Sequence, residues 1–597
     1  MKRYILSFAT LAILFTFAAC SDKDNDMPVP DSQAADIVVY GKIYTADNSE
    51  SMAEALAVKD GKYIFVGSKA DAQQYITNGT QVIDRTGTGM IMPGMTDGHS
   101  HYIMQQALPM FSENSLKFTS EDTYEDVVNK VRAKVEEAEA TGKKLDFIYG
   151  EGYNYMFFPK PRDCKDLDAI STEIPMFLAS FDQHSCWCNS AAMVNAGLID
   201  KDGNVLRDEI QGGVVAKDEQ GHLQGVFFER ATSLLLTKGL KYMRLTPSQA
   251  LEAVGNAQGY LHSVGITNVL CGWSTYFGND DKTFYQGLTD MEESHALKLN
   301  YALAYEIEPY FENPLSYVDS AAVFKQQYEK YPHILPNYIK LFADGTVEGG
   351  TGWLLQPYKP VTNGPVPGAY QGEGMPVWTL DQLTQFATKA NAKGIAIHVH
   401  TMGDGAVHNA CEAIKAGGDR SVRNALTHLR NVSAEDFKTM KSCNIAVAAA
   451  INWHNMDPET LETNKTLLPE YYATHSYPVK SYFDNGILVS SATDTPAHDG
   501  VNYPFHIMEV AVTGIDEEGQ QPWCPEENIT RQQALQAMTY NGAWQLGLEK
   551  ERGSIEAGKY ADFIILDQDV LTCPTTDIHS TKVLSTFFEG EQVYPKK

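Results

Sequence analysis

Eight short apolar runs with the character of buried strands recur along this chain, and stretches with helical character separate most of them. The runs lie at residues 90–102, 265–272, 300–307, 337–345, 393–404, 424–431, 444–453 and 486–494. Buried strands that alternate with helices are typical of a parallel sheet, and eight is the number of strands that closes a (β/α)8 barrel. The sequence therefore predicts an α/β protein with a TIM barrel within residues 94–545.

Two further regions surround the predicted barrel. Residues 104–250 are too long for the single helix that normally follows a barrel strand, so we expect an insertion after the first strand that caps the site. Residues 36–93 and 546–597 contain short runs in which apolar and polar positions alternate between Gly and Asp turn signals. We expect these two ends of the chain to build one small β-sandwich.

Composition limits the partners of the protein. The 597 residues include 47 Lys and Arg against 76 Asp and Glu, a net charge of −29 that repels phosphate backbones. We therefore expect a small-molecule substrate and no nucleic acid. The C-x-C pair of Cys186 and Cys188 has no second half, which favours buried thiols over a zinc knuckle. The oligomeric state stays open, and a dimer is compatible with the sequence.

The amino terminus predicts export. Lys2 and Arg3 precede an apolar run that ends at Cys20 and is shorter than the ~20 residues that span a bilayer, so residues 1–20 are predicted to be a signal peptide. The end of this run, "FAAC", resembles the lipobox of bacterial lipoproteins, in which the cysteine becomes the lipidated first residue. The alternative is an ordinary secretory signal with an incidental cysteine. With residues 21–35 as a flexible tether, we expect a protein anchored to the bacterial cell envelope by its lipid alone.

The first apolar run carries candidate metal ligands. Asp97, His99 and His101 occupy every second position, so on a strand their side chains share one face and point toward the barrel axis. Neutral imidazole is a common zinc ligand, and two ligands at positions i and i+2 are able to share one ion. Paired core histidines are the alternative. Asp97 is expected to support the strand or a histidine from behind.

Later runs end in further candidates. Lys340 interrupts an apolar run, where a charged ammonium is costly to bury, and carboxylation by carbon dioxide would turn it into an anionic oxygen ligand. His400, His428 and Asp494 each end a later run. Because the carboxyl ends of barrel strands meet at one face, we expect these four residues to join the two histidines of the first run in one metal site. Other histidines lie in polar stretches and are expected at the surface, among them His222, His295, His333 and His579.

In chain order this pattern resembles the amidohydrolase superfamily, in which the first strand supplies H-x-H, the fourth a lysine, the fifth and sixth one histidine each and the eighth an aspartate. Finer segments resemble the amidohydrolase 3 branch, also called YtcJ-like. They are "PGMTDGHSHY", "DQHSCWCNSAAM", "GGVVAKDEQGHLQGVFFE", "IKLFADGT", "HVHTMGDGA" and "ATDTPA". Two positions depart from that branch, which commonly has glutamate at Thr427 and serine at Thr493. His398 is the alternative to His400, which is favoured because the Gly-Asp turn of the branch follows it.

The resemblance implies a metal-dependent hydrolase that cleaves a carbon–nitrogen bond of amide, N-acyl or formamide type. Zinc would lower the pKa of a bound water, and Asp494 would accept the proton of that water and pass it to the leaving nitrogen. A carboxylated Lys340 would bridge two ions, whereas the unmodified lysine would leave one. The alternatives are a deaminase or isomerase on the same scaffold and a lipoprotein that binds a ligand without catalysis.

Three residues of the predicted insertion also match the branch. They are Asp182, His184 and Asn189 in "DQHSCWCNS". The resemblance implies that these side chains reach the substrate, and the alternative is that they hold the insertion together.

Overall fold

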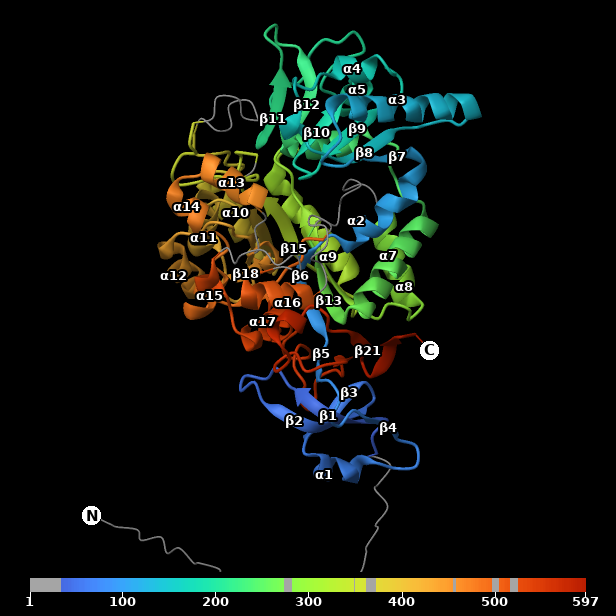
Figure 1. Ribbon diagram of the computed structural model, residues 1–597, viewed down its shortest axis with the longest axis vertical. Helices are drawn as coiled ribbons and strands as arrows, with labels where there is room; N and C mark the ends of the chain where they lie inside the picture. Colours follow the sequence, from blue (N-terminus) through green and yellow to red (C-terminus); the bar gives the residue numbers. More distant parts are fainter. Residues whose placement is uncertain are drawn as a thin grey trace, which may run out of the picture.

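The computed structural model describes residues 34–272, 282–347, 349–360, 372–454, 458–495, 504–515 and 524–596. These residues form three tiers in Figure 1: a sheet built from both ends of the chain, the barrel, and the insertion on the opposite side of the barrel. The predicted signal peptide, Cys20 and most of the predicted tether lie outside the described residues. No described helix is both long enough and apolar enough to cross a membrane.

The middle tier is a parallel barrel. Its strands pair in chain order, with β6 and β19 at the two ends of the ladder. The strands are β6 (Met95–Ser100), β13 (Ile266–Cys271), β14 (Asn300–Glu306), β15 (Ile334–Phe342), β16 (Ala396–Thr401), β17 (Ala425–His428), β18 (Ala446–Ala449) and β19 (Val489–Ser491). Every residue of β13 and β14 is buried, as is typical of parallel strands that are covered on both faces.

Two backbone hydrogen bonds bring the ends of this ladder together. The Asp494 amide donates to the His99 carbonyl at 2.9 Å, and the His101 amide donates to the Thr495 carbonyl at 2.7 Å. Each of the eight predicted runs overlaps one of the barrel strands. The prediction of a (β/α)8 barrel is therefore confirmed.

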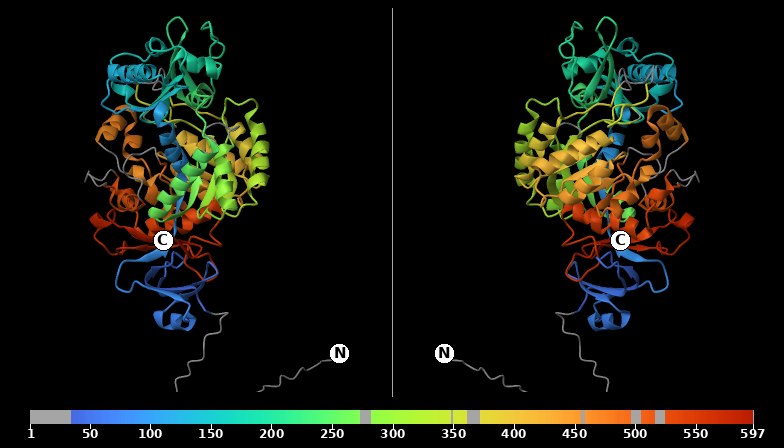
Figure 2. Two further views of the ribbon diagram at one scale, coloured as in Figure 1. Left: turned by 90° about the vertical axis from the view of Figure 1, so that its right-hand side faces the viewer. Right: turned by 90° about the vertical axis from the view of Figure 1, so that its left-hand side faces the viewer.

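Helices cover the outside of the barrel (Figure 2). They include α7 (Pro247–Ser263), α8 (Thr283–Glu293), α9 (Tyr317–Tyr328), α10 (Leu380–Asn391), α11 (Asp404–Gly417), α12 (Ala434–Cys443) and α17 (Arg531–Met538). Thr246, Thr379 and Thr530 cap three of these helices, each in a reciprocal pair with a glutamine three residues later. Such capping satisfies amide groups that the start of a helix leaves unpaired, so it determines where these helices begin.

The tier below the barrel joins both ends of the chain, as expected, but its strands pair in one continuous sheet where a sandwich of two sheets was expected. One sheet holds β1 (Ile37–Tyr44), β2 (Met52–Lys59), β3 (Lys62–Gly67), β4 (Gln81–Asp84), β5 (Ile91–Pro93), β20 (Phe563–Leu566), β21 (Val583–Phe588) and β22 (Glu591–Tyr594). The two parts meet where β20 pairs antiparallel with β5, with Phe563 opposite Pro93. They share an apolar core that includes Val39, Leu56 and Phe587. Because burial of this core needs both parts, the two ends of the chain depend on each other for stability.

An ion-pair cluster ties this sheet to the barrel. His333, directly before β15, lies 3.0 Å from Glu292 at the end of α8 and 3.3 Å from Glu589 after β21. Arg552 pairs in turn with Glu589 and Asp562. The His333 side chain is only 14% exposed, so the expectation that it lies at the surface is wrong. The covering residues come from distant parts of the sequence, which its polar neighbours do not reveal.

The tier above the barrel is a separate six-stranded sheet in the insertion. Its strands are β7 (Ser115–Lys117), β8 (Ile148–Tyr153), β9 (Met176–Ser180), β10 (Ser185–Cys188), β11 (Gly213–Lys217) and β12 (Leu223–Glu229). This sheet has its own core around the buried Trp187, to which α3 (Tyr124–Thr141) contributes. The turn between β9 and β10 carries His184, and α6 (Arg230–Leu234) directly follows β12.

Candidate functional site

Two histidines and one aspartate converge at the carboxyl end of the barrel. His99 lies on β6 and is buried, and His101 follows the end of that strand. Nε2 of each histidine lies 3.2 Å from Oδ1 of Asp494, which follows β19. Two imidazole nitrogens thus face one carboxylate oxygen. Such convergence of nitrogen and oxygen donors is typical of a site for a divalent metal ion.

His428, at the end of β17, completes this cluster. Its Nδ1 lies 3.8 Å from Oδ2 of Asp494, and one ligand atom from each of His99, His428 and Asp494 lies within 4.8 Å of the other two. Within the described part of the chain, the buried Nδ1 of His428 has no hydrogen-bond partner. Buried polar atoms are nearly always paired, so this nitrogen fits the role of a metal ligand.

The two histidines of β16 lie at different depths. His398 is buried, and its Nε2 lies 2.9 Å from Nδ1 of His99, which leaves Nε2 of His99 to face Asp494. The ring of His400 lies nearer the end of the strand, 4.6 Å from the ring of His428 between centroids. His398 therefore supports His99 from behind, while His400 borders the cluster with Nε2 3.3 Å from the carbonyl of Gly345.

Lys340 lies on β15, opposite His398 in the register of the two strands. Its side chain is buried, and its Nζ lies 4.6 Å from the centre of the Phe342 ring. Burial lowers the pKa of Lys340 to about 7. A large share of this amine is therefore neutral near neutral pH, which is the form that reacts with carbon dioxide.

The charges at the site favour metal binding. Burial lowers the pKa of His99 and His400 well below the usual range, and the nearby Lys340 adds to this effect. Burial raises the pKa of Asp494, but His428, His101 and His99 outweigh it and hold that pKa well below its usual range. His99 and His400 are thus neutral and the Asp494 carboxylate is charged, as metal ligands must be.

Neighbouring residues hold this geometry in place. Asp97 accepts hydrogen bonds from the Thr493 hydroxyl at 2.6 Å and the Thr493 amide at 3.1 Å, which ties β6 to the segment after β19. A side chain at Gly272 would place its Cβ 1.9 Å from the ring of His99. His428 and Asp494 both have positive φ, at 73° and 53°. Such strain in residues other than glycine is concentrated at functional sites.

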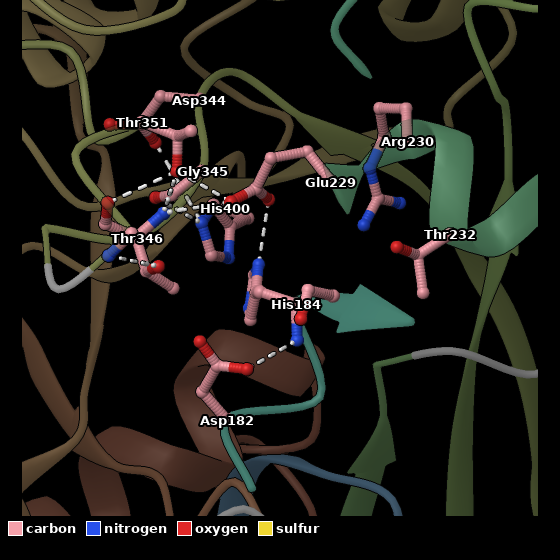
Figure 3. A network of polar contacts seen from close by, with 12 residues as sticks. Asp182, His184, Glu229, Arg230, Thr232, Asp344, Gly345, Thr346, Thr351 and His400 are labelled. Atoms are coloured by element: carbon pink, nitrogen blue, oxygen red, sulfur yellow. Dashed lines mark hydrogen bonds and ion pairs between the residues drawn. The ribbon is translucent and has the colours of Figure 1, made fainter. Parts of the chain in front are cut away.

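The insertion contributes a second polar group beside this cluster. His184 pairs its Nδ1 with Oε2 of Glu229 at 2.7 Å, and its ring lies 5.9 Å from the ring of His400 (Figure 3). Asp182 supports the same turn, because its Oδ1 accepts the His184 amide at 3.1 Å. Asn189 lies elsewhere: its side chain caps α5 (Ser190–Ala196), accepts two backbone amides and donates to two backbone carbonyls. Asn189 therefore holds the insertion together.

Glu229 was not among the residues singled out from the sequence. It is the last residue of "GGVVAKDEQGHLQGVFFE", so the segment that carries it was found, but the carboxylate itself was not. An acidic residue at the end of a strand in the insertion gives no local sign that it reaches the barrel. Its only sequence signal is its position directly after the last apolar residues of β12.

Comparison with known proteins places this geometry in a family context. The model described as "Amidohydrolase family" matches residues 81–594. The relative YtcJ of Bacillus subtilis is 26% identical over 565 residues, which cover 93% of this chain and 98% of that protein. The N-substituted formamide deformylase of Arthrobacter pascens is 23% identical over 573 residues, which cover 94% of this chain and 98% of that protein.

A solved structure supports the fold. An uncharacterized metal-dependent hydrolase from Pyrococcus furiosus superposes with a TM-score of 0.64 at 20% sequence identity, over 90% of this chain and all of that one. At this identity the likeness concerns the arrangement of the chain, and the chemistry is argued from the site itself.

Proposed function

The chain belongs to the amidohydrolase family, and we propose that it hydrolyses the carbon–nitrogen bond of a small formamide or other N-acyl compound. The observation that carries this proposal is the approach of His99 and His101 to one oxygen of Asp494, with His428 on the other oxygen. The name of the deformylase relative supports the substrate class, since that protein is similar to this chain over nearly its whole length.

We propose zinc as the ion. Imidazole nitrogens and a carboxylate oxygen are the donors that zinc prefers when it serves in hydrolysis. When bound, such an ion lowers the pKa of water to about 7 and polarises a carbonyl oxygen. Asp494 accepts the proton of the attacking water and delivers it to the leaving nitrogen, because its carboxylate is charged and lies at the centre of the histidines.

Lys340 decides the number of ions in this proposal. The lowered pKa of its amine favours reaction with carbon dioxide, and the resulting carbamate would add an anionic oxygen ligand on β15. His99, His101 and Asp494 would then hold one ion, and His400 and His428 a second. Without carboxylation the site would hold a single ion. We favour two ions.

A metal analysis paired with a substrate screen tests the proposal. Mature protein from cells grown with zinc should contain one to two equivalents of the metal, and it should release amine from one or more of a panel of formamides, N-acyl amino acids and cyclic amides. Folded protein without metal would contradict the proposed site. A metal-loaded protein that releases only ammonia from ring amines would favour deamination instead.

We also propose that Cys20 carries a lipid that anchors the protein to the bacterial cell envelope. Cys20→Ala should abolish lipidation, because only a thiol at the mature amino terminus accepts the lipid. The variant should leave the membrane fraction when cells expressing it are separated into soluble and membrane parts. Labelled lipid that still enters the variant would contradict the anchor.

A further inference from the structure

A buried ion pair from the insertion stands beside the metal centre. His184 lies in the turn between β9 and β10, and its Nδ1 is 2.7 Å from Oε2 of Glu229. Figure 3 shows the His184 ring between Asp182 and Glu229, with His400 of the barrel close to Glu229. The ring centroids of His184 and His400 are 5.9 Å apart. The pair is therefore near enough for a substrate to touch both it and the metal ligands.

Glu229 is fixed by contacts to the barrel. Its Oε1 accepts a hydrogen bond from the Thr351 hydroxyl and a longer one, 3.4 Å, from the Thr346 amide. A Cβ at Gly345 would lie 2.3 Å from the carboxyl carbon of Glu229, so only glycine leaves room there. This carboxylate thus packs on the loop that follows β15, and it joins the insertion to the rim of the barrel.

The backbone around the pair is strained. Glu229 has φ 54° and ψ −129°, and Gln183, next to His184, has φ 62°. Positive φ in such residues is unfavourable and persists where the surroundings impose it, often at sites of function.

One nitrogen of His184 is committed and the other is open. Nδ1 is held by Glu229, whereas Nε2 has no hydrogen-bond partner within the described residues. The side chain is 21% exposed, while that of Glu229 is 3% exposed. The Glu229 carboxylate on Nδ1 balances the charge of an imidazole that carries a proton on each nitrogen.

Resting on the proposed amide hydrolysis, we propose that His184 is a catalytic residue that donates a hydrogen bond from Nε2 to the carbonyl oxygen of the substrate. Glu229 is the positioning residue that holds the ring and balances its charge. Negative charge develops on this oxygen as water adds to the carbonyl carbon, and a fixed donor stabilises it most at that stage. The proton stays on His184, so Asp494 remains the group that moves a proton.

Steady-state kinetics of four variants test this assignment. With a substrate found in the screen, His184→Gln should lower kcat by about 10²–10³-fold with little change in KM, as loss of one oxyanion donor does. Glu229→Gln should lower kcat by about 10–100-fold, as loss of a supporting partner does. The double variant should be no slower than His184→Gln, because residues that act as a unit are not additive.

His222→Gln is the matched control. His222 also pairs with an aspartate of the insertion, Asp218 at 3.1 Å, but its side chain is 70% exposed. This variant should keep the wild-type kcat. All four proteins should keep their metal content and Tm. A His184→Gln variant with wild-type kcat, or losses that multiply in the double variant, would overturn the assignment.

Binding of formate separates this inference from the proposed function. One product of formamide hydrolysis is formate, which is a carboxylate. Removal of a charged hydrogen-bond donor from a site typically weakens the binding of an anion by at least tenfold, about 1.4 kcal/mol. Calorimetry on the metal-loaded proteins should therefore find formate at least tenfold weaker in His184→Gln than in wild type. A wild type that hydrolyses no amide would refute the hydrolase proposal alone. Equal formate affinity, or no formate binding by wild type, would refute the role of His184.

Discussion

Two clusters of histidine and carboxylate lie at opposite ends of the same barrel. At the carboxyl end, His99 and His101 approach a single carboxylate, that of Asp494. At the amino end, His333 stands alone between two carboxylates, those of Glu292 and Glu589. The first cluster has too few acids for its histidines, and the second has more acids than histidines.

This difference sets the charge of each imidazole. Burial lowers the pKa of His333, but its two carboxylates outweigh it and raise that pKa to about 9. Burial and Lys340 instead hold the pKa of His99 well below the usual range. A charged histidine held between two carboxylates is a structural tie, whereas the neutral His99 shares one carboxylate with His101 and suits a metal ligand. Barrels in general keep stability at the amino end and chemistry at the carboxyl end.

Removal of the metal should have the largest effect of all the tests, because it acts only on the cluster at the carboxyl end of the barrel. Dialysis against a chelator should reduce hydrolysis to background, and added zinc should restore it, because the histidines and Asp494 alone do not supply a Lewis acid. Tm should also fall, since a ligand bound only by the folded state stabilises it. Elemental analysis should confirm that the dialysed protein is free of metal. If that protein still hydrolyses the substrate, the histidines at the carboxyl end do not act through a metal ion, and the proposed difference from the amino end is wrong.

Asp494→Asn should have the next largest effect. Asparagine keeps the shape but cannot accept a proton, so kcat should fall by about 10²–10⁴-fold while KM changes little. His333→Gln at the other end should keep the wild-type kcat, although it also removes charge from a histidine–carboxylate cluster. Metal content measured on both variants is the control. A metal-loaded Asp494→Asn protein with the wild-type rate would show that another group handles the proton.

Much of this contrast was accessible from the sequence, for a physical reason. Strands covered on both faces must be apolar throughout, so the barrel strands stand out as runs, and polar residues within them stand out in turn. His99, His101 and Lys340 were found in this way. His398 and His400 are two residues apart, so the sequence places both on one face of a strand but does not show how deep each lies in the barrel. Only the contact of His398 with His99 in the structure separates their roles.

The residues that sequence reasoning missed depend on approach between distant segments. Glu229 gains its importance from His184, 45 positions earlier, and from the loop that carries Gly345. His333 is covered by Glu589, 256 positions later. No periodicity links such pairs. The local sequence around a polar residue in a polar stretch is the same whether that residue lies at the surface or in a buried ion pair.

His333→Gln should lower stability without loss of activity. The change leaves Glu292 and Glu589 without their shared cation, and a broken, largely buried pair costs about 1–3 kcal/mol when some solvent reaches it. The Tm of the metal-loaded protein, measured by calorimetry at pH 7, should therefore fall by about 1–2 °C, because a long chain has a large entropy of unfolding. His222→Gln is the control and should leave Tm within about half a degree, because its ion pair is exposed. An unchanged Tm in His333→Gln would mean that the cluster does not tie the barrel to the terminal sheet.

The smallest effect should appear in the pH dependence of the difference in Tm between wild type and His333→Gln. The pKa of His333 is about 9 in the folded protein and about 6.5 in an unfolded chain, so folding favours its protonated form. Its contribution to stability is then complete below pH 6.5 and is lost as pH rises through 9. The gap in Tm between wild type and His333→Gln should therefore be widest at pH 6–7, narrow through pH 8 and 9, and nearly close at pH 10. Both proteins need the same zinc concentration throughout, so that changes at the metal centre cancel in the comparison. A gap that stays constant from pH 6 to pH 10 would show that His333 is held by packing, and the two ends of the barrel would then differ in burial rather than in charge.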